Sequence, residues 1–292
     1  MRFTLILLPC LFVVSLARAQ APAPAQDVAP KSAPLEIRFS TADELKAEFS
    51  SVPCKDSARR DAVKALFERA GADPASVTIE KPRGIENVVV RIPGAASDQK
   101  IVIGAHYDKV DAGCGAVDNW TGIVTMAHLF RTLKDQKLNK TVIFVAFGQE
   151  EKGLLGSSAM AAEIKKEQVA EYCAMINIDS LGLAIPQVAD NMSSKKLVDL
   201  SAAVAEQMKM PFAHARIEGA DSDSSSFVKK KIPALTIHAM NNEWNKVLHT
   251  GNDQGAKVNP ESVFLGYRLA LSLLVRIDQA DCREFRDNKD NK

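Results

Sequence analysis

Short, almost fully apolar runs alternate with amphipathic segments along most of this chain, and this alternation constrains the fold more than any other feature. The clearest run is Ile101-Val102-Ile103-Gly104-Ala105, which is typical of a strand that helices bury on both faces. The alternation predicts an α/β fold: a single domain with a mostly parallel mixed sheet, covered by helices on both faces.

The individual elements follow from helical spacing, strand-like apolar runs and the positions of Gly and Pro. Because such sheets bind ligands at the carboxyl ends of their strands, the residues that follow each strand are the first candidates for a site. The expected helices are 41–50, 57–70, 120–133, 155–165, 194–208, 224–230 and 261–277, and the expected strands are 77–80, 87–92, 101–106, 141–147, 172–178, 212–217 and 234–238.

The two ends of the chain do not have the pattern of a folded domain. Residues 1–19 combine Arg2, an apolar run and the sequence Ala17-Arg18-Ala19, which predicts a cleaved signal peptide rather than a membrane anchor. Residues 20–34 are rich in Ala and Pro and are expected to be an extended tether. We therefore expect a catalytic domain over 35–283 and a polar tail over 284–292.

The signal peptide predicts an exported protein, periplasmic or secreted, with no membrane span in its mature form. Four cysteines remain after its removal, and an oxidising compartment allows them to form disulfides in three complete pairings, which the sequence does not distinguish. A catalytic thiol is open in principle at Cys114, although a disulfide or no role is the preferred interpretation. The four cysteines are Cys54, Cys114, Cys173 and Cys282.

The charge balance excludes one class of partner. The chain has 37 basic and 36 acidic residues and no dense stripe of Lys or Arg. Nucleic-acid binding requires such a stripe, so no nucleic acid is expected as a partner.

Histidines and carboxylates lie where the predicted strands end, or in the loops that follow. Two imidazoles and several carboxylates on one edge of a sheet are the ligands of hydrolytic zinc, and they can hold two ions that share a carboxylate. A further carboxylate is then needed to move a proton. The residues are His106, Asp108 and Asp118 after one strand, Glu150 and Glu151 after the next, Asp179 after the third, and His249 late in the chain.

Five motifs in this region resemble one known family, the zinc aminopeptidases related to bacterial leucyl aminopeptidase and yeast aminopeptidase Y. Any one motif is weak, but five in the family's order are specific. They are Gly104-Ala105-His106-Tyr107-Asp108, Gly115-Ala116-Val117-Asp118-Asn119-Trp120-Thr121-Gly122, Glu150-Glu151-Lys152-Gly153-Leu154-Leu155-Gly156-Ser157, Asn177-Ile178-Asp179 and Leu248-His249-Thr250.

The resemblance implies a phosphorylase/hydrolase-like zinc exopeptidase fold and about two Zn²⁺ ions per chain. It implies that His106 and Asp179 bind one ion, that Glu151 and His249 bind the other, and that Asp118 bridges them. It also implies that Glu150 is the catalytic general base. Asp108 would orient the imidazole of His106, as a ligating histidine usually requires.

The sequence departs from the family pattern at three positions. Val117 replaces a further Asp, Ser224 replaces a His in Ser222-Asp223-Ser224, and Gly251 stands where Pro is common. None of the three is an expected ligand. Outside the ligand set, His128 and His214 are expected to be structural or surface residues, whereas a substrate contact stays open for His238.

The family also implies the partner, a peptide with a free amino terminus, and the activity, hydrolysis of its amino-terminal residue. Three other functions are weighed against it: a glutaminyl-peptide cyclotransferase of the same fold, a carboxypeptidase for acidic residues, and a non-catalytic peptidase-like binding ectodomain. The complete ligand set favours the aminopeptidase. The preferred amino-terminal residue and the oligomeric state stay open.

Overall fold

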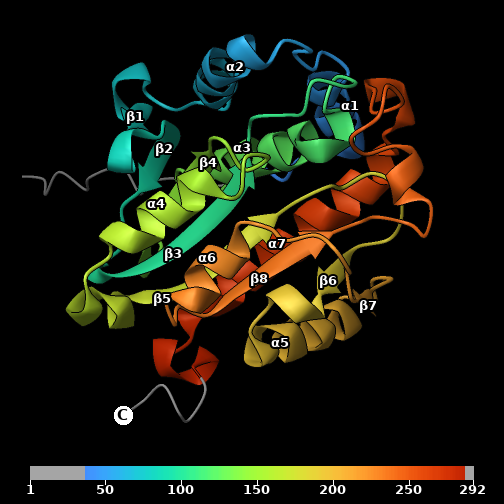
Figure 1. Cartoon of the computed structure of the whole chain (residues 1–292). Helices are drawn as coiled ribbons and strands as arrows, with labels where there is room; N and C mark the ends of the chain where they lie inside the picture. The colour runs from blue at the N-terminus through green and yellow to red at the C-terminus, as the bar shows by residue number, and fades with distance from the viewer. Residues whose placement is uncertain (1–36, 287–292) are drawn as a thin grey trace, which may run out of the picture. The chain divides into compact units, whose positions relative to one another are not determined.

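The structure, a computed structural model, describes residues 37–286, and its centre is a sheet of eight strands. The signal peptide and the tether predicted for 1–34 lie outside the described residues, as does the segment 287–292. The strand order is β1-β2-β4-β3-β5-β8-β6-β7 (Figure 1). The strands are β1 (Thr78–Glu80), β2 (Asn87–Ile92), β3 (Ala96–His106), β4 (Lys140–Phe147), β5 (Tyr172–Ile178), β6 (Gln187–Ala189), β7 (Ala213–Ala215) and β8 (Ala234–His238).

The four central strands, β4, β3, β5 and β8, are parallel to one another. At one edge β1 and β2 form an antiparallel hairpin that continues antiparallel onto β4, and at the other edge β6 is antiparallel to β8. The predicted mixed α/β sheet is therefore confirmed. Because the four central strands are parallel, the residues that follow them meet along the side of the sheet where these strands have their carboxyl ends.

Helices cover both faces of the sheet, as the alternation predicted (Figure 1). Alternate side chains of a strand point to opposite faces. Ile101 and Ile103 accordingly join the larger core, beneath α3 and α7, whereas Val102 joins a second core with Phe227 of α6. The helices are α1 (Ala42–Phe49), α2 (Asp56–Arg69), α3 (Thr121–Leu133), α4 (Leu155–Glu163), α5 (Lys195–Gln207), α6 (Ser224–Lys229) and α7 (Pro260–Gln279).

Most elements lie within one or two residues of the expected bounds, but β3 begins at Ala96 rather than Ile101, and β7 covers only Ala213–Ala215 of the expected 212–217. The strand β6 was not predicted, because three residues are too few to show a period. The helix α3 begins at Thr121 rather than Trp120, because residues Ala116–Trp120 form a π-helical turn. Within this turn the backbone angles of Asp118 and Asn119 are not helical. This turn places Asp118 at the sheet edge.

The four cysteines form two disulfides, Cys54–Cys114 and Cys173–Cys282. This settles the pairing that the sequence left open, and it removes Cys114 as a candidate thiol. Near the end of the described chain, Cys282–Phe285 form a short 3-10 helix that packs into the larger core. Within residues 37–286, no helix is both long and apolar enough to cross a membrane.

Candidate metal centre

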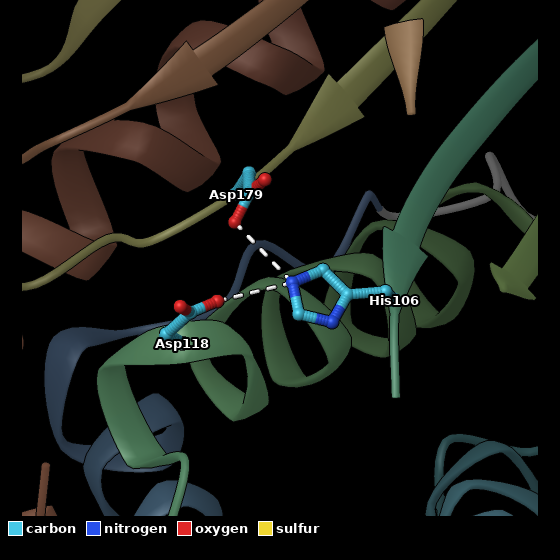
Figure 2. A group of neighbouring side chains, drawn as sticks. All are labelled: His106, Asp118 and Asp179. Carbon is cyan, nitrogen blue, oxygen red and sulfur yellow. Dashed lines mark hydrogen bonds and ion pairs between the residues drawn. The ribbon is translucent and has the colours of Figure 1, made fainter. Parts of the chain in front are cut away.

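The first group of ligands gathers around the ring of His106, the last residue of β3. Its Nε2 atom lies 3.0 Å from Oδ1 of Asp118 and 3.6 Å from Oδ1 of Asp179, which directly follows β5 (Figure 2). The imidazole of His106 is buried. One nitrogen and two carboxylate oxygens therefore converge on a point that a small cation can occupy.

The second group gathers around His249. Its Nε2 atom lies 3.0 Å from Oδ2 of Asp118 and 3.1 Å from Oε2 of Glu151. The other oxygen of Glu151 is buried and has no hydrogen-bond partner among the described residues. A buried carboxylate oxygen without a partner is costly, and a metal ion would supply one.

The two groups share Asp118, which contributes one oxygen to each. In each group the ligand atoms lie within 4.8 Å of one another, the spacing expected around one metal ion. All five residues predicted as ligands from the sequence are thus brought together. Imidazole and carboxylate donors in this arrangement suit a pair of divalent ions.

Asp108 supports the site through two different groups. Its backbone carbonyl oxygen lies 3.2 Å from Nδ1 of His106, so it can accept the Nδ1 proton and leave Nε2 free for a cation. Its carboxylate lies farther from that ring, 3.7 Å, and accepts the backbone N–H groups of Glu150 and Glu151 instead. Asp108 therefore connects the loop after β3 to the loop after β4.

The carboxylates perturb both histidines of the site. Burial alone would lower the pKa of His106, but Glu150 and the carboxylates facing the ring raise it well above its ordinary value. Hydrogen bonds to Asp118 and Glu151 raise the pKa of His249 to about 10. The carboxylates thus concentrate negative charge at the carboxyl ends of the central strands, and this charge favours the binding of cations there.

Glu150 lines the same cavity as the five ligands. Burial raises its pKa to about 10, and the charges of Asp223 and Asp179 add to the effect, whereas His106 opposes it. Cations bound beside Glu150 would stabilise its carboxylate and lower this pKa. Glu150 is placed to exchange a proton with a molecule in the cavity.

Two buried residues that the sequence reasoning left without a role hold the loop of Asp118. The guanidinium of Arg59 donates hydrogen bonds to backbone carbonyls of this loop, at Tyr107, at Cys114 (2.9 Å) and at Gly115 (3.1 Å). The carboxylate of Asp253 accepts the backbone N–H groups of Val117 and Asp118, at 2.7 and 3.2 Å. No sequence motif indicated either contact, because both depend on distant segments meeting in space.

Ser222 is a further residue that the sequence did not single out as functional. Its hydroxyl donates to Oδ2 of Asp179 at 2.5 Å and accepts from Nδ2 of Asn177 at 2.7 Å. It therefore orients a ligand carboxylate from behind. Ser224, which replaces the expected histidine, instead bonds the carbonyl of Met192 and the hydroxyl of Thr236.

Residues 87–272 of this chain match a known family model, that of peptidase family M28. This chain belongs to peptidase family M28. The match covers the sheet from β2 through β8 and all of the residues of the metal centre.

Individual proteins and solved structures are similar to this chain at lower sequence identity, between 19% and 26% for the three described next. Leucine aminopeptidase 1 of Penicillium rubens is 26% identical over 222 residues, which are 66% of this chain and 57% of the relative. BSAP, a zinc aminopeptidase from Bacillus subtilis, superposes with a TM-score of 0.60 at 24% identity, over 71% of this chain and 54% of that one. A glutaminyl cyclase from an Acidobacteriales bacterium superposes with a TM-score of 0.68 at 19% identity, over 89% of this chain and 99% of that one.

Proposed function

We propose that this chain is a secreted or periplasmic zinc aminopeptidase that hydrolyses the amino-terminal residue of peptides. The observation that carries the proposal is Asp118, whose two oxygens serve two ligand groups beside Glu150. The chain spans little more than half the length of the Penicillium relative.

Zinc is the proposed metal, with about two ions per chain, because the donors are imidazole and carboxylate and because BSAP is a zinc aminopeptidase. His106 and Asp179 would hold one ion, Glu151 and His249 the other, and Asp118 both. When bound, the two ions supply Lewis-acid charge that polarises a carbonyl group and acidifies water.

The residues of the chain would then divide the remaining work. The carboxylate of Glu150 takes the proton of the attacking water and delivers it to the leaving amine. Asp108 fixes the backbone of Glu150 and Glu151 through its two carboxylate oxygens, so the base and its neighbour keep a defined separation. The surrounding negative charge attracts the free α-amine of a peptide substrate.

Export is the proposed location. The signal sequence predicted over 1–19 supports it, although that segment lies outside the described residues, and the two disulfides are typical of an oxidising compartment. The tether over 20–34, the domain over 35–283 and the tail over 284–292 remain predictions.

Hydrolysis of a panel of aminoacyl p-nitroanilides by the purified protein tests the proposal, before and after chelation, with zinc assayed on the same sample. Chelator-sensitive release with about two zinc ions per chain would support it. A glutaminyl cyclase is the second candidate, since one such structure matches this fold over nearly its whole length. No release, together with cyclisation of a glutaminyl peptide, would favour that candidate.

A further inference from the structure

His238 lies beside the metal centre but belongs to neither ligand group. It ends β8, which lies between β5, the strand that presents Asp179, and β6. It lines the same cavity as the metal ligands, and it is only 2% exposed. Its ring is therefore one strand beyond the ligand Asp179, on the side away from His106.

The hydrogen bonds of His238 determine which ring nitrogen carries the proton. Nδ1 accepts the backbone N–H of Met240 at 3.3 Å, so the proton of the neutral ring is on Nε2. Nε2 is buried and has no hydrogen-bond partner among the described residues. A buried N–H without an acceptor is unfavourable, and when it lines a cavity a ligand can satisfy it.

The cavity wall around His238 is mostly apolar. Met192 and Ile217 belong to a small buried cluster against which Met240 packs, and all three line the cavity. The hydroxyl of Thr236, also on this wall, is already occupied by Ser224. Among the described residues, the N–H of His238 is thus a buried donor without a partner, beside the apolar side chains of Met192, Ile217 and Met240.

We propose that this wall receives the side chain of the substrate's amino-terminal residue, and that His238 donates a hydrogen bond from Nε2 to a carbonyl oxygen on it. The preferred residues are then asparagine and glutamine, whose carboxamides offer such an oxygen. This inference rests on the proposed aminopeptidase function and names its substrate class. The cavity, about 190 Å³, far exceeds the roughly 10–15 Å³ that holds one water, so a side chain has room.

Charge and length argue against acidic and seryl side chains at this wall. On the apolar wall an aspartyl or glutamyl carboxylate would lose its hydration, and among the described residues no Lys or Arg side chain lines the cavity to pair with it. A seryl hydroxyl is short and would leave the apolar wall uncovered. A carboxamide is neutral, accepts through its carbonyl oxygen, and has an apolar stem that can contact Met192 and Ile217.

The test compares substrates of nearly equal shape, using the zinc-loaded full-length protein. Asparaginyl is paired with leucyl p-nitroanilide, and glutaminyl with methionyl p-nitroanilide, and kcat/KM is measured for each. We expect the wild type to favour the carboxamide member by roughly tenfold or more, because the apolar member leaves Nε2 unpaired.

Two conservative variants distinguish the roles of the two ring nitrogens of His238. His238→Asn keeps an acceptor near the position of Nδ1 for Met240 but removes the Nε2 donor, and His238→Gln keeps a donor near the position of Nε2. The preference should disappear in His238→Asn, through a lower kcat/KM on the carboxamide substrates, and return in part in His238→Gln. Met240→Leu, which changes the wall but not the donor, should retain it.

Other results would overturn the inference. A wild type that shows no carboxamide preference, or a preference unchanged in His238→Asn, overturns it while the aminopeptidase function stands. An equal loss on all substrates in His238→Asn would assign the ring to the scissile peptide group instead. Ammonia release from the glutaminyl substrate without p-nitroaniline would overturn the aminopeptidase proposal itself, and its loss in His238→Asn would still support carboxamide binding.

Discussion

His106 and His249, far apart in the chain, lie against opposite oxygens of one carboxylate: each Nε2 is 3.0 Å from Asp118, the first from Oδ1 and the second from Oδ2. Each histidine therefore defines its own cation position, and Asp118 belongs to both. A substitution of either histidine should therefore remove one bound metal ion, whereas a substitution of Asp118 should affect both.

Zinc analysis of dialysed variants checks this difference. His106→Gln and His249→Gln should each retain about one zinc ion per chain, whereas Asp118→Asn should lose most of both, because an amide is a poor bridging ligand. His214→Gln, at an exposed histidine on β7, is the matched control and should retain about two. Normal zinc content in Asp118→Asn would contradict the shared-ligand arrangement.

The substitution Glu150→Gln should leave zinc bound but reduce kcat by roughly 10²–10⁴, because the amide cannot accept the proton of the attacking water. Turnover and zinc content are measured on the same preparation. Glu163→Gln, at an exposed position of α4, controls for the loss of one negative charge. Near-normal activity in Glu150→Gln would remove Glu150 as the base.

The hydroxyl of Ser222 should matter through Asp179, to which it donates at 2.5 Å. Ser222→Ala should weaken zinc binding by roughly 10–100-fold, since partners of this kind orient a ligand without touching the metal. Competition with a zinc-binding dye measures the dissociation constant. Ser201→Ala, which removes a buried hydroxyl bonded only within α5, should leave it unchanged.

Arg59 should stabilise the loop of Asp118. Replacing it by Met removes the donors to three loop carbonyls and should lower the free energy of unfolding by about 3 kcal/mol or more. Denaturant unfolding in the presence of a chelator isolates this effect from metal binding. Arg60→Met, which removes a more exposed neighbour, should cost less than about 1 kcal/mol. Equal losses in both variants would contradict the assignment.

His128 should make the protein sensitive to acid. Burial and the charge of Arg131 lower its pKa to about 4, whereas the unfolded value is about 6.5. Because the unfolded chain binds the extra proton between these values, the contribution of His128 is full above pH 6.5 and is lost as the pH falls toward 4. Between these two pH values the free energy of unfolding should fall by up to about 1.4 kcal/mol for each pH unit.

The measurement is the difference in unfolding free energy between wild type and His128→Gln across that pH range, with a chelator present. The difference should become smaller or reverse as the pH falls, because glutamine does not titrate. A difference that is independent of pH would show that His128 does not cause the acid sensitivity.

The strand ends were predictable because their signal is local. The apolar run before His106 and those before Glu150 and Asp179 each identify a strand by composition alone, and β5 and β8 have the predicted bounds. Parallel neighbours then bring these ends to one edge. The sheet, the helices on its faces and the ligand candidates were determined at this level.

Contacts between distant segments were decided only by the tertiary structure. Arg59 resembles any other helical arginine in the sequence, yet it is fully buried under the loop of Asp118. The disulfide pairing, the support of Asp179 by Ser222 and the unpaired nitrogen of His238 were likewise not readable from local patterns. The physical reason is that the period of a segment reports its burial, whereas hydrogen bonds and cavities depend on which segments meet when the whole chain packs.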